Sequence, residues 1–207
     1  EVAQELSTGR ALANASNWRS PALTNGQAPW RVVLIVEDDS DGKAVRALVA
    51  PLHVQGVIDW LPANGIGNIL RDCRRLIDLA RDRIQAHGCV AIVIDGDGRS
   101  VARDEPHRTI ARECRRSRVP LIVIREALEA WMLADPGICQ WLAIPTRPTT
   151  HTLRDPKDLV SRAFLRKTGR PYRRRRARLE VAQHATGVTR SANPSFHEAV
   201  GHLEGCG

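Results

Sequence analysis

The chain has 207 residues, of which 43% are hydrophobic and 26% charged, and its formal net charge is +8 at pH 7. This composition excludes wholesale disorder and fits an α/β core of about 120 residues with smaller appendages. The chain contains no apolar stretch of the roughly 18 residues that a membrane span requires, so we expect no membrane association, whereas the basic excess favours nucleic acid as a partner.

Strands and helices are expected to alternate through the first part of the chain. Continuous apolar runs predict strands that are buried on both faces, and a stripe of apolar residues at helical spacing predicts each helix between them. The expected strands are 31–36, 54–61, 89–94 and 119–124, and the expected helices are 43–52, 66–86 and 106–117. This alternation predicts a mainly parallel sheet flanked by helices.

The two ends of the chain differ from this central part. Residues 1–29 are rich in Ala, Asn, Ser, Pro and Gly and are expected to form an N-terminal extension, which is followed by an α/β domain over 30–144. A helical, Arg-rich appendage is expected over 145–207. Its helices are predicted at 156–168, 175–186 and 195–204, and one further helix is predicted before it, at 126–135. We expect Asp39 or Ser40 to cap the first helix of the domain, and Ser195 the last helix of the chain.

The five cysteines are odd in number, widely spaced and never arranged as Cys-x-x-Cys. This pattern predicts neither a zinc site nor a disulfide framework, and it favours a reducing cytoplasm. The first residues, Glu-Val-Ala-Gln-Glu, lack the basic start and apolar core of a signal peptide. We therefore expect a cytoplasmic protein.

Carboxylates follow three of the predicted strands. Because the carboxyl ends of parallel strands meet at one edge of a sheet, these side chains should cluster there. Crowded carboxylates repel one another unless a cation neutralises them, and oxygen ligands favour Mg²⁺ or Mn²⁺. The sequence therefore predicts a metal site that polarises a phosphodiester. Its metal ligands would be Glu37, Asp41, Asp95, Asp97 and Glu129, and the catalytic set would be Glu37, Asp95 and Asp97, with Glu37 as general acid or base.

Structural explanations compete with these roles. Asp95-Gly96-Asp97 is also ordinary turn chemistry, and an acid such as Glu129 suits the first turn of any helix. Asp135 simply precedes a proline, and Trp131 is expected in the core rather than as a platform for a base. A phospho-accepting receiver domain would also begin with an acidic turn after the first strand. However, the strand at 119–124 does not lead into the hydroxyl residue and lysine that a receiver requires.

Glu37 on a strand-to-helix turn, followed by Asp95-x-Asp97 at the end of a later strand, resembles the TOPRIM domain, the catalytic fold of topoisomerases, primases and overcoming-lysogenisation-defect nucleases. The resemblance is closest to an uncharacterised bacterial TOPRIM-like family related to those nucleases, and four motifs in order carry it. These motifs are Val36-Glu37-Asp38 with Asp41; Glu126, Glu129, Ala130, Trp131, Leu133 and Asp135; Asp155-Pro156-Lys157; and Pro194-Ser195-Phe196. One departure is Asp38, which stands where TOPRIM domains usually have glycine.

This resemblance implies a TOPRIM/Rossmann-like fold and a Mg²⁺-dependent nuclease that acts on DNA or RNA. It further implies an ATPase partner protein and a role in phage defence, and it is compatible with a homo-oligomer. The alternative is a TOPRIM-like subunit that binds nucleic acid or regulates a partner without cutting.

A basic block in the C-terminal region is the second candidate site. Such a block neutralises phosphates, and a tyrosine within it can stack on an unpaired base. A solvated helix face is the structural alternative. The predicted nucleic-acid-binding residues are Arg166, Lys167, Arg170, Tyr172, Arg173, Arg174, Arg175 and Arg176.

Overall fold

The fold is described from a computed structural model, which covers residues 30–52, 56–84, 88–145, 149–150, 152–188 and 192–205. The extension predicted for residues 1–29 lies outside these described residues. Within them, no helix is long and apolar enough to cross a membrane.

The central sheet has four parallel strands in the order β2-β1-β3-β4. They are β1 (Arg31–Val36), β2 (Val57–Pro62), β3 (Gly88–Asp95) and β4 (Leu121–Ile124). β1 and β3 are the inner strands, and their side chains are buried on both faces, as their continuous apolar sequences predict. The predicted parallel α/β architecture is therefore confirmed.

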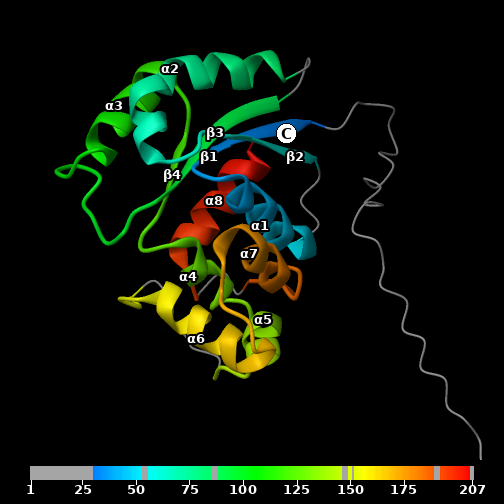
Figure 1. The fold of residues 1–207 in the computed structure, drawn as a ribbon. Helices are drawn as coiled ribbons and strands as arrows, with labels where there is room; N and C mark the ends of the chain where they lie inside the picture. Colours follow the sequence, from blue (N-terminus) through cyan, green and yellow to red (C-terminus); the bar gives the residue numbers. More distant parts are fainter. Residues whose placement is uncertain are drawn as a thin grey trace, which may run out of the picture.

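Helices cover both faces of the sheet (Figure 1). On one face, α2 (Ile66–Asp82) and α3 (His107–Ser117) pack on side chains such as Ile35 and Ile92. On the other face lie α1 (Asp39–Val49), which continues into the 3-10 turn η1 (Ala50–Leu52), and the C-terminal helices. The two faces alternate residue by residue because successive side chains of a strand point in opposite directions.

The C-terminal helices belong to the same core as the sheet. They are α4 (Leu128–Met132), α5 (Pro136–Leu142), α6 (Pro156–Thr168), α7 (Arg174–Ala182) and α8 (Pro194–Glu204). Trp131 is fully buried, donates through Nε1 to Ser195 Oγ at 2.8 Å and meets the ring of Phe196 edge-on at 5.2 Å. The domain boundary predicted between residues 144 and 145 stays a prediction, but the helices beyond it share a core with the strands.

Two predicted helix caps are wrong. α1 begins at Asp39 rather than Lys43, because Asp38 accepts from Ser40 N–H while Asp41 accepts from Asp38 N–H, which forms a reciprocal capping box. α8 is capped by Asn193 rather than Ser195, because Pro194 takes the first helical position.

The helix predicted over 126–135 divides into two. α4 spans only Leu128–Met132, and Pro136 does not merely stop it but opens α5. Asp135 caps α5 by accepting from Ile138 N–H, and its carboxylate also accepts from the backbone N–H groups of Thr186 and Gly187. The structural explanation for Asp135 is thus confirmed.

The cysteines depart from the prediction at one position. Cys73, Cys114 and Cys139 are buried, and Cys139 Sγ donates to the carbonyl of Leu133 at 3.2 Å, but Cys89 is disulfide-bonded. The spacing of cysteines along a chain does not report how close the folded chain brings them, which is why the pattern missed this bond.

Candidate active site at the carboxyl edge of the sheet

Glu37 and Asp95 meet where the two inner strands end. Glu37 directly follows β1, and Asp95 is the last residue of β3, which pairs with β1 in parallel. Glu37 Oε1 accepts from Asp95 N–H at 3.0 Å. The parallel register therefore brings together two acids that lie 58 residues apart in the sequence.

Asp95 is held firmly in this position. Its Oδ1 accepts from Leu128 N–H at 3.0 Å, which ties β3 to the start of α4. Its backbone carbonyl lies 3.0 Å from Nε2 of the buried His107, the first residue of α3. Its other carboxylate oxygen, Oδ2, faces a cation.

That cation is the ammonium group of Lys157, from the first turn of α6. Its Nζ lies 3.3 Å from Asp95 Oδ2 and 3.1 Å from Asp97 Oδ1. Asp155 caps α6 and Pro156 is its first residue, so the Asp-Pro-Lys motif fixes the helix start that carries Lys157 to the acids. No pattern in the sequence predicts this role of Lys157.

Burial and crowding shift the titration of these acids. Burial raises the pKa of Asp95, and the ammonium of Lys157 opposes that rise. Burial and the charge of Asp95 likewise raise the pKa of Glu37, while the hydrogen bond from Asp95 N–H lowers it. Both carboxyl groups thus hold a proton to a higher pH than an ordinary acid does.

Asp41 and Glu129 lie beside a different cation. Arg178, from α7, contacts Asp41 Oδ1 through Nη1 and Glu129 Oε1 through Nη2 at 2.9 Å. Tyr172 also donates to Glu129 Oε1, at 3.0 Å. Glu129 Oε2 is buried and has no hydrogen-bond partner within the described part of the chain, and burial together with the charge of Asp95 raises the pKa of Glu129.

The departure at Asp38 has a simple structural account. Its backbone is extended, with φ −134°, a conformation that any residue adopts, so glycine is not required there. Its side chain caps α1, and it lies 3.7 Å from the exposed guanidinium of Arg175. Asp38 therefore stabilises the turn that carries Glu37.

The predicted basic block divides into an exposed set and a residue at the acidic edge. Tyr172 belongs to the edge, since its hydroxyl contacts Glu129 and its ring packs edge-on against Phe164 at 5.6 Å. Its stacking on a base stays a prediction. The exposed members are Arg166, Lys167, Arg170, Arg173, Arg175 and Arg176, while the side chain of Arg174 lies outside the described part of the chain.

The acidic edge fits a divalent cation by its chemistry. It offers hard carboxylate oxygens, and Glu129 Oε2 is a buried acceptor with no partner among the described residues. As the described side chains stand, however, no three of His, Cys, Asp and Glu are grouped closely enough to hold a metal ion. Lys157 occupies the position between Asp95 and Asp97, so a metal bridging the two would compete with its ammonium group.

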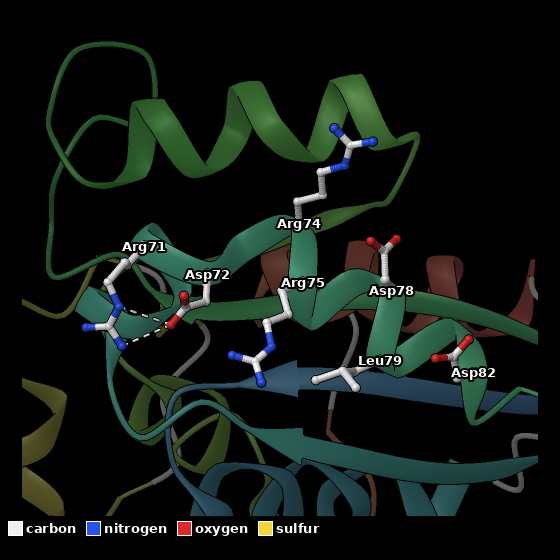
Figure 2. Close-up of a pocket in the computed structure, with 7 residues that line it drawn as sticks. All are labelled: Arg71, Asp72, Arg74, Arg75, Asp78, Leu79 and Asp82. Atoms are coloured by element: carbon white, nitrogen blue, oxygen red, sulfur yellow. Dashed lines mark hydrogen bonds and ion pairs between the residues drawn. The ribbon is translucent and has the colours of Figure 1, made fainter.

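A depression elsewhere on the surface has no link to this edge. It encloses about 480 Å³ on the outer side of α2 and is lined by Arg71, Asp72, Arg74, Arg75, Asp78, Leu79 and Asp82 (Figure 2). Its basic and acidic side chains balance, and Arg71 pairs with Asp72 at 2.9 Å. None of the predicted site residues lines it.

Comparisons with known proteins leave the family open. No family model matches the chain, and no curated protein matches it in sequence. Among solved structures, the chain is similar to the C-terminal region of the OLD protein of Xanthomonas campestris pv. campestris. The identity is 17%, the match covers 85% of this chain and 93% of that one, and the TM-score is 0.47. At this identity and TM-score the likeness carries no conclusion about fold or activity. The family therefore stays a resemblance.

Proposed function

We propose that the chain is a Mg²⁺- or Mn²⁺-dependent phosphodiesterase that hydrolyses nucleic acid at the carboxyl edge of the sheet. The observation that carries this proposal is the contact of Glu37 with the backbone of Asp95, together with the ammonium group of Lys157 between Asp95 and Asp97. Raised pKa values, as burial gives Glu37 and Asp95, cluster at functional sites.

Each residue then has a defined task. Asp95 and Asp97, with Glu37, would hold the divalent cation, which polarises the scissile phosphodiester and offsets the charge that develops on the leaving oxygen. Glu37 accepts the proton of the attacking water, a role that suits a carboxylate with a raised pKa. Lys157 contributes a positive charge that can pair with a phosphate oxygen once it leaves the two aspartates.

The exposed arginines of α6, α7 and the loop between them would bind the phosphate backbone. Their number gives this binding a steep dependence on salt. Removal of one contact, for example by Arg176→Gln, should lower the slope of log K against log salt by about one. An unchanged slope would place nucleic acid elsewhere on the protein.

A second candidate is a subunit that binds nucleic acid but does not cut it. The position of Lys157 favours it, because the ammonium group already neutralises the aspartates that a metal would bind. The defence role and the ATPase partner implied by the TOPRIM resemblance belong to either proposal.

A cleavage assay separates the two. Purified wild type is incubated with supercoiled, linear and single-stranded DNA and with RNA, in Mg²⁺, Mn²⁺ or EDTA. Asp95→Asn removes a central ligand, and Asp78→Asn, on the exposed side of α2, is the matched control. We expect cleavage by wild type and Asp78→Asn only with metal, and none by Asp95→Asn. Equal cleavage by all three would refute the site, and binding without cleavage would favour the second candidate.

A further inference from the structure

Arg178 is a buried cation at the acidic edge. Its side chain is only 3% exposed, and it reaches from α7 to the first turn of α1 and to α4. It contacts Asp41 and Glu129, whose side chains are 16% and 0% exposed. These two acids lie 137 and 49 residues away from it in the sequence, so the contact depends entirely on the packing of α7 against α1 and α4.

Both carboxylate oxygens of Asp41 have a partner. Its Oδ1 contacts Arg178 Nη1, and its Oδ2 accepts from Asp38 N–H at 2.9 Å in the capping box. A divalent cation at Asp41 would compete with the guanidinium of Arg178, whose side chain is only 3% exposed, and with the cap of α1. The same cation at Asp95 would compete with the ammonium group of Lys157, whose side chain is 26% exposed and therefore easier to displace.

The hydrogen bonds described for the Glu129 carboxylate all go to one oxygen, Oε1. Its Oε1 accepts from Arg178 Nη2 at 2.9 Å, from Arg178 Nε at 3.2 Å and from Tyr172 Oη at 3.0 Å. Its Oε2 has no partner among the described residues. Arg178 and Tyr172 thus fix the orientation of the carboxylate, and the one open oxygen of Glu129 falls short of the several oxygen ligands that a divalent cation takes.

The charge of Arg178 persists at neutral pH. A guanidinium is protonated at pH 7. Its single charge therefore offsets one of the two negative charges of these acids.

We propose that Arg178 is the fixed counter-ion of Asp41 and Glu129, so that only the part of the edge formed by Glu37, Asp95 and Asp97 recruits a divalent cation. Arg178 is then a positioning residue, and the edge takes up one metal ion. This inference deepens the proposed function and rests on it for the identity of the metal.

Counting bound Mn²⁺ tests the inference without any cleavage assay. Mn²⁺ is titrated at pH 7 into the full chain, and the free ion is counted by electron paramagnetic resonance. The variants are Asp41→Asn, Arg178→Gln and Asp95→Asn. The matched control is Arg175→Gln, which removes an exposed guanidinium of the same helix. Circular dichroism checks that each variant is folded.

We expect one Mn²⁺ in wild type, in Arg175→Gln and in Asp41→Asn, with no loss of affinity in either variant. Asp95→Asn should bind at least about tenfold more weakly, because loss of an outer-shell partner already costs about 10- to 100-fold in metal affinity and Asp95 is a proposed direct ligand. Arg178→Gln frees two buried carboxylates and should gain a second Mn²⁺. Loss of the ion in Asp41→Asn, or no gain in a folded Arg178→Gln, would overturn the inference.

Two outcomes separate the inference from the proposed function. If Arg178→Gln does not fold and wild type binds Mn²⁺, the number of Mn²⁺ ions bound by Asp41→Asn alone decides whether the inference holds. If wild type binds no Mn²⁺, the proposed function is contradicted, and the inference survives only if Arg178→Gln gains one ion. It is overturned if that variant gains none or fails to fold.

Discussion

Replacing Lys157 by methionine tests whether its ammonium group neutralises the acidic edge. Methionine keeps much of the length of the side chain and removes the charge. The side chains of Lys157 and Asp95 are 26% and 17% exposed, whereas that of Asp97 is 56% exposed. The pair with Asp95 therefore accounts for most of the effect, because solvent screens the pair with Asp97.

The size of the loss follows from this intermediate burial. Exposed ion pairs contribute about 0 to 1 kcal/mol, and removal of one partner of a fully buried pair costs about 3 to 5 kcal/mol. For Lys157→Met we expect the free energy of unfolding in EDTA at pH 7 to fall by about 1 to 3 kcal/mol. At a Mn²⁺ concentration of 100 times the Kd of the variant, the variant should gain about 2.7 kcal/mol, and wild type at the same concentration should gain less, because its ammonium group competes with the metal.

Urea unfolding of both proteins, with and without Mn²⁺, measures these values. Lys167→Met, which removes an exposed charge of the same helix, is the control and should match wild type. A Lys157→Met variant that is as stable as wild type in EDTA, or that gains no more from Mn²⁺, would refute the counter-ion role of Lys157.

Three further predictions concern the pH dependence of stability, the cap of α5 and the buried hydrogen bond of Trp131. Because burial raises the pKa of Asp95 and Glu37, the folded state binds protons more tightly than the unfolded state does above about pH 4. The stability of the metal-free protein should then fall as the pH rises through that window. Asp95→Asn should show a shallower fall in urea unfolding, and an equal fall would mean that Asp95 does not titrate there. Asp135→Ala removes the cap of α5 and leaves backbone donors unpaired, so we expect a loss of about 2 to 4 kcal/mol by chemical denaturation, and a loss below about 0.5 kcal/mol would contradict this role. Ser195→Ala leaves the buried Nε1 of Trp131 without its acceptor and should cost about 1 to 2 kcal/mol, whereas Ser161→Ala, at a partly exposed position of α6, should cost little.

The sheet and its acidic edge could be predicted because their signals are local and strong. β1 and β3 are buried on both faces, so their sequences are continuous apolar runs that no amphipathic helix would show. Once the strands are parallel, the residues that follow them must share an edge, and this alone places Glu37 near Asp95.

The cations of the edge could not be predicted in the same way. Lys157 reaches Asp97 across 60 residues, and Arg178 reaches Asp41 across 137, from helices whose packing no pattern reports. Arg178 is part of a run of arginines in which it looks no different from its exposed neighbours. Only its place on α7, which turns it toward α1 and α4, separates it from them.

The predicted start of α1 is wrong for a different reason. Three consecutive residues, Asp38, Asp39 and Ser40, are all good N-caps, and composition does not choose among them. Asp38 becomes the cap because its backbone N–H also donates to the carboxylate of Asp41, which completes the capping box. That bond also takes up one oxygen of a residue that the sequence had suggested as a metal ligand.

The central claim is that Glu37, Asp95 and Asp97 bind the catalytic metal. The most direct measurement is a crystal structure of the protein grown with Mn²⁺, with the ion located by its anomalous scattering. We predict one anomalous peak in contact with Asp95 and Asp97, with the ammonium group of Lys157 moved away from the two carboxylates. A peak between Asp41 and Glu129, or none at this edge with Lys157 still in place, would contradict the account.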